Sequence, residues 1–402
     1  MICQFGFKNF RSYKNETVFD FQAAALSEFK KSLIENESAS SLLPVSVIYG
    51  PNGGGKSNII YALSCLISTV VKPIYDLKKN RIQYISQTEV PVESFLFDDC
   101  SSGEPTEFNL YFRKNAYEYR YYLALSNSGI ESESLFRKKL GGKRTATIFI
   151  REKNNIELGA SIDKASINKD VNPKMPYLSF LSINYNISVI TEVQEWFESC
   201  IISDYSNPNY ETLIPLIDDK SFNSLLFHML NDMDIEVTGF HYDKENKELF
   251  LTRKINESIY SLPFSNESAG TKKAFVVLPS IIIALKEGRL LIVDELDAKL
   301  HPKLLRYIIK LFTNPRINKN HAQLLFTSHD LSTMKNDVFR RDEIWFAALG
   351  KDLSSEIYSL YDIRKEDGNR VNNSAAYDKQ YLEGRYGADP YLKSMLDWED
   401  QI

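Results

Sequence analysis

The chain has 402 residues, of which 43% are hydrophobic and 25% charged, a composition typical of a globular protein with two or three domains. The net charge of −5 argues against general attraction to nucleic acid, although a local basic patch is still compatible with it. No apolar run reaches the roughly 18–20 residues of a membrane span, and the opening "MICQFGFKNFRSYKNE" lacks the apolar stretch of a signal peptide. We therefore expect a cytoplasmic protein with no membrane partner, and its four cysteines, which lack metal-site spacing, to be buried, reduced thiols.

A nucleotide-binding loop is predicted where the chain reads "GPNGGGKS", which fits G-x-x-x-x-G-K-[ST] at every fixed position. An apolar strand, "PVSVIY", precedes the loop and an apolar helix, "SNIIYALSCLISTVV", follows it. Glycines let backbone N–H groups point at phosphates, and the helix N-terminus adds a positive dipole. Lys56 supplies a mobile charge and the Ser57 hydroxyl is a ligand for Mg²⁺, so we expect ATP and Mg²⁺ as cofactors. The predicted nucleotide-binding residues here are Gly50, Pro51, Asn52, Gly53, Gly54, Gly55, Lys56, Ser57 and Asn58.

The region after the P-loop helix alternates between polar and apolar residues in "TEFNLYFRKNAYEYRYYLALS" and carries turn signals such as "NSG" and "LGG". This pattern predicts an antiparallel sheet up to about residue 155. A basic cluster runs from Arg137 to Lys153. It is either a solvated hairpin tip, which is the commoner case, or a patch that binds nucleic acid.

The next segment is predicted to be helical, because "ITEVQEWFESCIISDY" and "DDKSFNSLLFHMLNDM" place apolar residues at i, i+3 and i+4. These helices are too short to form the arms of a long coiled coil, so we expect a compact lid or oligomerisation module. The segment "EVTGFHYDKENKELFLTRK" is then predicted to return as a hairpin.

A second anion cradle is predicted at "SAGT", where Ser268 and Gly270 open a helix that Gly288 closes. The apolar run "LLIV" that follows reads as a buried parallel strand ending in Asp294 and Glu295. Asp294 is placed to hold Mg²⁺, and Glu295 to polarise the attacking water. The alternative for these two acids is a surface loop.

A further buried strand, "LLFT", delivers Ser328, His329 and Asp330 at its end. A histidine at the end of a strand that follows the Asp-Glu pair is well placed to sense the γ-phosphate. We therefore expect His329 to act beside Glu295 in catalysis.

The order of these motifs resembles the ATP-binding-cassette ATPases of the SMC, RecF and OLD type: P-loop, long insertion, S-x-G signature, "LLIVDE", the "LDAKLHP" D-loop and "TSHD". The resemblance implies an α/β fold, namely an ABC-type P-loop ATPase head with a mixed core sheet, an antiparallel β subdomain and a compact helical insertion. The opening "FGFKNFRSYKNETVFDF" is similar to the family's first strand and loop, whose N-F-R-S stretch lies beside the nucleotide. It adds Arg11 and Ser12 to the predicted nucleotide site.

In that family two heads sandwich ATP, so the resemblance implies a homo-oligomer, at least a dimer, in which Ser268 and Gly270 serve the partner's ATP. No clear Q-loop glutamine follows the P-loop, and Gln83 and Gln87 are equal candidates. The expected domain plan is an N-terminal head part (1–158), a helical insertion (159–235) and a C-terminal head part with the tail (236–402).

The tail is predicted to contain a further strand in "FRRDEIWFAALGKD". Its R-R-D-x-I-W-F and Y-x-x-G-R-Y-G-A-x-P segments are similar to those of prokaryotic ABC-type ATPases associated with phage defence, such as the RloA-type and PARIS-type ATPase subunits. These work with a separately encoded effector, often a nuclease. The alternative is that the tail only completes the fold.

Two function classes follow from these resemblances. The first is an ATPase regulator or sensor of an anti-phage system whose ATP-bound oligomer holds or releases an effector. The second is a RecF- or OLD-like DNA-binding or repair ATPase. The chain after His329 contains no D-x-D pattern and is too short for the nuclease domain of the OLD type. A third interpretation, ATP as structural glue, does not require the water-polarising Glu295.

Overall fold

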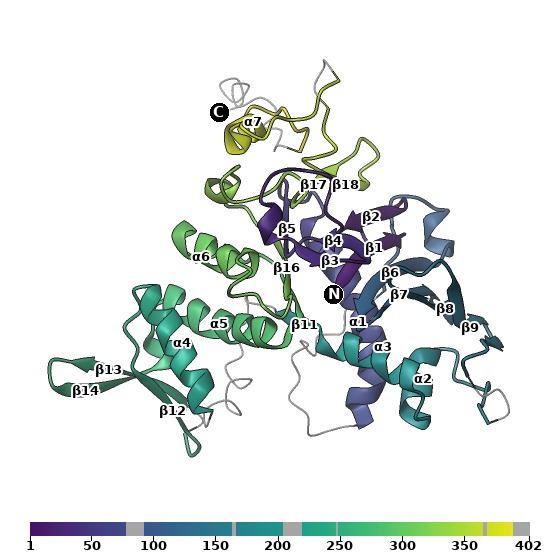
Figure 1. The fold of residues 1–402 in the computed structure, drawn as a ribbon, viewed down its shortest axis with the longest axis horizontal. Coiled ribbons are helices and arrows are strands. Elements are labelled where there is room, and N and C mark those ends of the chain that lie inside the picture. Colours follow the sequence, from purple (N-terminus) through teal and green to yellow (C-terminus); the bar gives the residue numbers. More distant parts are fainter. Residues whose placement is uncertain (78–91, 163–165, 204–218, 247, 365–367, 389–402) are drawn as a thin grey trace, which may run out of the picture.

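The computed structural model describes residues 1–77, 92–162, 166–203, 219–246, 248–364 and 368–388 (Figure 1). The largest sheet has seven strands in the order β10-β9-β8-β7-β6-β1-β2, and all its neighbours are antiparallel. This is the antiparallel sheet predicted after the P-loop. Its strands are β1 (Ile2–Lys8), β2 (Thr17–Asp20), β6 (Thr106–Lys114), β7 (Tyr117–Ser126), β8 (Gly129–Lys139), β9 (Thr145–Glu152) and β10 (Asn155–Leu158).

The second sheet has six strands in the order β11-β15-β16-β5-β17-β18. All are parallel except the edge strand β18. The runs "VSVIY", "LLIV" and "QLLFT" are buried at every residue, as expected for parallel strands covered on both faces. The strands are β5 (Val45–Tyr49), β11 (Ile201–Ser203), β15 (Leu290–Val293), β16 (Gln323–Thr327), β17 (Ile344–Leu349) and β18 (Ser355–Ser359).

Helix α1 (Lys56–Leu77) packs between the two sheets. Its buried residues share one hydrophobic cluster with the antiparallel sheet and with Ile48, Ile292 and Leu325 of the parallel strands. Alternate residues of the same strands, such as Val47, belong to a second cluster on the opposite face. Among the described residues α1 is the one helix long and apolar enough to cross a membrane, but 61% of the relevant window is buried inside the fold, so α1 is a core helix.

The second cluster is built from helices α4, α5 and α6 against the far face of the parallel sheet, together with the short C-terminal helix α7. Figure 1 shows α5 and α6 beside the strands β11 and β16. The predicted fold class is confirmed: a mixed α/β core with an antiparallel β subdomain and helical segments. The remaining helices are α2 (Tyr177–Asn184), α3 (Ser188–Ser199), α4 (Lys220–Asp232), α5 (Ala269–Glu287), α6 (Pro302–Thr313) and α7 (Tyr377–Leu382).

The helical segment differs from its prediction at one point. The expected helix in "ITEVQEWFESCIISDY" ends at Ser199, and β11 then pairs in parallel with β15. The pairing extends the core sheet by one strand, so this region contributes to the head itself. Helices α2 and α3 likewise share the cluster that contains α1 and the antiparallel sheet. The role of residues 159–235 as a separate module stays a prediction.

The predicted hairpin after α4 forms, but it has a third strand that was not predicted. Strand β14, "SIYSLP", follows β13 after a tight turn and pairs with it in antiparallel fashion, on the side opposite β12. Figure 1 shows this sheet projecting away from the rest of the molecule. The strands are β12 (Gly239–Asp243), β13 (Glu248–Ile255) and β14 (Ser258–Pro263), and a separate two-stranded sheet contains β3 (Ile34–Asn36) and β4 (Ala39–Leu42).

The basic cluster is only partly a solvated hairpin tip. Lys143 and Arg144 are exposed in the turn between β8 and β9, but Arg151 is buried, with its Nη1 atom 3.7 Å from a carboxylate oxygen of buried Glu133. The Glu133 carboxylate also accepts hydrogen bonds from the first two backbone N–H groups of α2, at 2.6 and 2.9 Å. Arg151 is therefore a structural residue that helps to anchor α2 on the antiparallel sheet.

All four cysteines are free thiols. Cys3, Cys65 and Cys200 are buried, as expected, whereas Cys100 is exposed. Burial raises the pKa of Cys3 and of Cys200 to about 12, so these two thiols stay protonated and behave as small core residues.

Candidate functional site

The P-loop joins β5 to α1 at the carboxyl edge of the parallel sheet. Gly50 and Gly55 have φ angles of 144° and 101°, which side chains other than glycine rarely adopt. A Cβ atom at Gly50 would collide with the backbone of Ala347 in β17, and one at Gly55 would collide with the side chain of Ser355. The neighbouring strands therefore require glycine at both ends of the loop.

Lys56 begins α1 and is 6% exposed. Its ammonium group donates hydrogen bonds to the carbonyl oxygens of Gly50 (2.9 Å) and Pro51 (3.0 Å). Burial lowers the pKa of Lys56, and the nearby carboxylates of Asp294, Glu295 and Asp297 oppose this shift. The ammonium group thus lies against the loop that would hold the phosphates.

A chain of hydrogen bonds links the P-loop to the ends of two parallel strands. The Ser57 hydroxyl donates to Oδ1 of Asp294 at 3.1 Å, and the Thr327 hydroxyl donates to the same oxygen at 2.5 Å. The Thr327 hydroxyl also accepts from the backbone N–H of Glu295 at 2.7 Å. The structure thus joins three predicted site residues, Ser57, Asp294 and Glu295. It adds Thr327, for which the sequence predicts only a place in a buried strand.

The residues present fit a magnesium ion. Mg²⁺ at a nucleotide site is held by one or two protein oxygens together with phosphate oxygens and water. The Ser57 hydroxyl and the Asp294 carboxylate are such oxygens, and they already lie within hydrogen-bonding distance. Within the described ranges, no group of three or more His, Cys, Asp or Glu side chains could form an all-protein metal site.

Glu295 has an exposed side chain and a backbone φ of 50°. This left-handed conformation is unusual for a residue with a side chain and costs on the order of 1–3 kcal/mol. The peptide groups on both sides of it are held. Its N–H bonds to Thr327, and its carbonyl accepts from Lys273 Nζ at 2.9 Å and from the Ala298 N–H at 3.1 Å.

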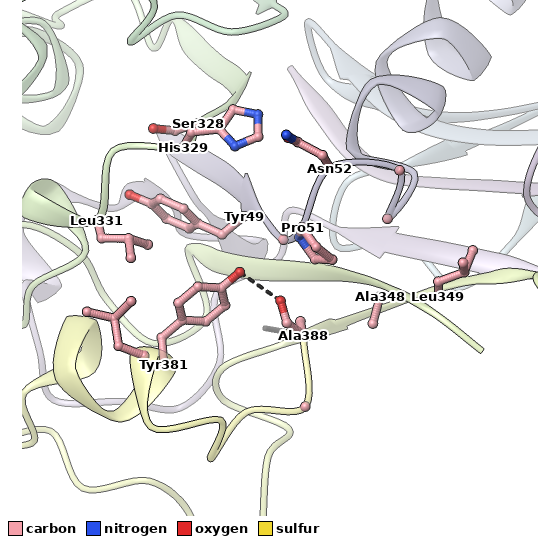
Figure 2. Close-up of a pocket in the computed structure, with 15 residues that line it drawn as sticks. Tyr49, Pro51, Asn52, Ser328, His329, Leu331, Ala348, Leu349, Tyr381 and Ala388 are labelled. Atoms are coloured by element: carbon pink, nitrogen blue, oxygen red, sulfur yellow. Dashed lines mark hydrogen bonds between the residues drawn. The ribbon is translucent and has the colours of Figure 1, made fainter. Parts of the chain in front are cut away.

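His329 follows β16, and its backbone N–H donates to the carboxylate of Asp297 at 3.0 Å. Figure 2 shows the imidazole of His329 and the side chain of Asn52 facing each other. Both line a pocket of about 590 Å³ beside the P-loop. Tyr381, Leu382 and Ala388, all from the tail, also line this pocket, which was not predicted from the sequence.

The turn after β1 lies next to the end of the P-loop and the start of α1. The Ser12 hydroxyl accepts a hydrogen bond from the Asn58 amide at 2.8 Å and lies 2.8 Å from the Ser355 hydroxyl. The guanidinium of Arg11 lies 4.6 Å from the centre of the Tyr61 ring on α1. The structure therefore brings Arg11, Ser12 and Asn58 together at the start of α1. It also places Ser355, which was not among the predicted site residues, in this group. Their predicted contact with nucleotide stays a prediction.

The signature residues lie elsewhere. Ser268 is the N-cap of α5, is exposed, and accepts a hydrogen bond from the Thr271 N–H at 3.1 Å. Neither Ser268 nor Gly270 is among the residues that line the P-loop pocket. The preceding Glu267 is buried and forms a two-bond pair with Arg253 of β13, at 2.5 and 2.8 Å, which fixes the start of α5 to the three-stranded sheet. The Q-loop candidates Gln83 and Gln87 lie outside the described residues.

Residues 45–335 match one protein-family model, described as "AAA domain, putative AbiEii toxin, Type IV TA system". The chain belongs to this family. The matched range contains the P-loop, the signature, Asp294, Glu295 and His329, so all the predicted site residues except Arg11 and Ser12 lie within the AAA-domain match.

No curated protein matches the chain. Among solved structures, the chain is similar to the "SMC head domain from Thermotoga maritima", with 13% identity over 89% of this chain and 98% of that one and a TM-score of 0.43. It is also similar to "the recombination mediator protein RecF-ATPrS in RecFOR pathway", with 11% identity over 90% of this chain and 98% of that one and a TM-score of 0.32.

Proposed function

We propose that this protein binds and hydrolyses ATP with Mg²⁺ and uses the nucleotide to control a separately encoded partner in an anti-phage system. The observation that carries the ATPase proposal is the chain of hydrogen bonds from Ser57 through Asp294 and Thr327 to Glu295. It supports the proposal because it joins Asp294, the candidate metal ligand, and Glu295, the candidate general base, to the P-loop at the carboxyl edge of one sheet.

Each residue then has a chemical task. The P-loop N–H groups and Lys56 hold the phosphates and stabilise the charge that develops on them. Bound Mg²⁺ would neutralise charge on the phosphate oxygens from the side of Ser57 and Asp294. Glu295 orients a water molecule and takes its proton as the water oxygen bonds to the γ-phosphorus and the bond to the β-phosphate oxygen breaks. His329 follows the neighbouring strand β16, and its imidazole faces Asn52 of the P-loop (Figure 2).

We further propose that two copies of the chain sandwich ATP, with Ser268 and Gly270 of one copy capping the nucleotide of the other. Two features support this arrangement. The N-terminus of α5 is exposed, with Ser268 as its cap, and an N-terminus of this kind favours an anion. A Cβ atom added at Gly270 would lie 3.6 Å from the carbonyl oxygen of Lys299 in the D-loop, so the signature and the D-loop of one copy would present a common surface.

The defence role rests on two resemblances. The tail is similar to that of ATPases which work with a separate effector, often a nuclease, and the family description names a toxin of a toxin–antitoxin system, which is also a two-component arrangement. The tail residues Tyr381 and Ala388 line the pocket that contains Asn52 and His329. A tail in this position provides a route by which the nucleotide state could reach a partner bound at the C-terminal side.

The experiment measures ATP hydrolysis, partner binding and phage resistance together. The wild type is expected to hydrolyse ATP and to copurify with the product of the neighbouring gene in a nucleotide-dependent manner. Cells that carry both genes are expected to resist some phages. Lys56→Ala should remove all three properties, whereas Lys286→Ala, at an exposed position on α5, should retain them. Resistance that persists without ATP binding, or without the partner, would overturn the regulator proposal.

A second candidate, a RecF-like nucleic-acid-binding ATPase, is favoured by one observation on the antiparallel sheet. A pocket of about 410 Å³ combines the rings of Tyr111 and Phe136 with the cations of Arg120, Arg137 and Lys138. The Arg120 guanidinium lies 5.7 and 5.9 Å from the two ring centres. Aromatic and basic groups together suit single-stranded nucleic acid. Salt-dependent binding of a labelled oligonucleotide that is lost in Lys138→Glu would support this candidate over the first.

A further inference from the structure

Lys273 is a buried lysine in the second turn of the signature helix α5. It is 5% exposed, and burial lowers its pKa to about 8. Its Nζ atom donates a hydrogen bond of 2.9 Å to the carbonyl oxygen of Glu295. The neighbouring Lys272, in contrast, donates to the carbonyl of Ser265, outside the nucleotide site. A buried ammonium group is costly unless it is paired, so a specific task for Lys273 is expected.

The charged groups around Lys273 come from the loop that follows β15, at the carboxyl edge of the parallel sheet. The carboxylates of Asp297 and Glu295 favour its charged form, whereas Lys299 opposes it. Asp297 in turn accepts the backbone N–H of His329. The ammonium group therefore lies among the residues that precede and form the D-loop, although its own helix begins at the signature.

The residue that Lys273 contacts is conformationally strained. Glu295 has a φ of 50°, and two side chains from outside its own loop hold its backbone, Thr327 at the N–H and Lys273 at the carbonyl. Without the Lys273 bond only the Ala298 N–H would remain at this carbonyl, and without the Thr327 bond the Glu295 N–H would lose its partner, so either loss would favour relaxation toward a commoner conformation. Such a relaxation would turn the Glu295 carboxylate away from its working direction, and a displacement of about 1 Å in a catalytic group can cost up to about 100-fold in rate.

We propose that Lys273 is a positioning residue that holds Glu295 in its working conformation and so couples the two nucleotide sites of the dimer. This inference rests on the proposed function. Ser268 caps α5 and would contact the partner's ATP. Lys273, on the same helix, bonds to the backbone carbonyl of Glu295, the residue whose carboxylate would act on the ATP of its own protomer. A helix rises about 1.5 Å per residue, so the five-residue step from Ser268 to Lys273 spans less than about 10 Å of rigid backbone. Movement of the helix start toward the partner's phosphate therefore reaches Glu295 directly.

The coupling is reciprocal, as any linkage of two binding sites must be. When the start of α5 engages the partner's ATP, Lys273 holds Glu295 in its working conformation. Conversely, Glu295 in this conformation favours the position of α5 that engages the partner's ATP. ATP engagement at the two sites should therefore be cooperative, and we expect that cooperativity to depend on Lys273 and to appear in the Hill coefficient of hydrolysis.

The test replaces Lys273 with methionine, which keeps the length and the apolar stem but removes the donor. Lys286→Met, at an exposed position in the last turn of the same helix, is the matched control. We expect Lys273→Met to lower kcat by about 10- to 100-fold with ATP affinity within twofold of the wild type, and to bring the Hill coefficient of hydrolysis close to one. The control should match the wild type in all three.

A double variant separates positioning from a general structural role. If Lys273 acts through Glu295, adding Lys273→Met to Glu295→Gln should slow single-turnover hydrolysis by less than twofold more. A merely structural defect would lower the rate by the same factor in both backgrounds. Should the methionine variant fail to fold, Lys273→Gln, which keeps a polar group but is too short to reach the Glu295 carbonyl, takes its place in the same comparison.

The outcomes are distinguishable. Wild-type protein without ATP hydrolysis overturns the proposed function and this inference with it. Wild-type hydrolysis with an unchanged kcat and Hill coefficient in the Lys273 variant overturns the inference alone. The inference is also overturned if Lys273→Met lowers the rate by the same factor in the wild-type and in the Glu295→Gln background.

Discussion

Thr327 and Asp294 are joined by a hydrogen bond of 2.5 Å from the threonine hydroxyl to the carboxylate oxygen Oδ1, although they end different strands and lie far apart in the sequence. The same hydroxyl accepts the N–H of Glu295. One threonine thus bonds to both the proposed metal ligand and the backbone of the proposed general base. Because the strands β15 and β16 are adjacent and parallel, their carboxyl ends meet at this point.

The first prediction concerns this threonine. Thr327→Val keeps the shape of the fully buried side chain but removes the hydroxyl. A hydrogen bond to a charged group is worth about 1.5–3 kcal/mol, so we expect turnover at saturating ATP to fall by at least about tenfold. The Mg²⁺ concentration for half-maximal turnover should rise, because the proposed metal ligand Asp294 loses the bond that orients it. Thr327→Ser keeps the hydroxyl and should stay close to the wild type. Full turnover in the valine variant would remove Thr327 from the site.

The second prediction concerns the general base. Glu295→Gln should bind ATP as the wild type does but hydrolyse it at least about 100-fold more slowly, because an amide is a far poorer base. The ATP-bound pair should then accumulate, which size-exclusion chromatography with light scattering can measure. Glu236→Gln, at an exposed position outside the site, is the control. Unchanged single-turnover rates would show that Glu295 is not the base.

The third prediction tests whether the two nucleotide sites are shared between copies. A Cβ atom at Gly270 would make only ordinary contacts within its own chain, the nearest at 3.6 Å. Gly270→Glu should therefore fold and bind ATP, but its carboxylate should repel the partner's γ-phosphate and prevent pairing and turnover. Activity in this variant alone would contradict the sandwich.

Mixing Gly270→Glu with Lys56→Ala extends the same test. A mixed dimer has one site with both defects and one site with neither, so part of the ATPase activity should return, at a reduced rate because the defective site cannot help to hold Glu295 of the intact site in its working conformation. Mixed dimers are verified by pull-down through a tag on only one of the two variants. If they form and remain inactive, either both sites must act together or the signature serves its own subunit.

The fourth prediction concerns pH and stability. Burial raises the pKa of Glu343 from 4.5 to about 8, and its carboxyl accepts the backbone N–H of Arg340 at 2.8 Å. The folded state therefore holds a proton that the unfolded state has lost between these two pH values. The stabilising contribution of Glu343 is complete below about pH 4.5 and is lost as the pH rises through about 8.

Glu343→Gln removes this titration. Relative to the wild type, the variant should gain free energy of unfolding as the pH rises from about 5 to 8.5, as measured by urea denaturation at several pH values. Glu356→Gln, at an exposed position of β18, should leave the wild-type pH dependence intact. A constant difference between Glu343→Gln and the wild type across this range would contradict the assignment.

The sequence by itself determined the parts of the site that depend on neighbours along the chain. The P-loop, the capped start of α5 and the strand that ends in Asp294 are local patterns, in which glycine spacing, a cap residue or an unbroken apolar run is sufficient. Their positions in the structure follow the prediction closely, because fully buried parallel strands and capped helices have little conformational choice.

Only the tertiary structure decided which distant residues complete the site. Thr327, Lys273 and Ser355 act through hydrogen bonds to residues 22 to 343 positions away, and no local pattern distinguishes such a threonine, lysine or serine from others in the chain. The strand β11 is a similar case, since three residues became a strand only because the exposed edge of β15 was available to pair with them. Contacts of this kind depend on how the sheets and helices pack, which the order of the residues alone does not reveal.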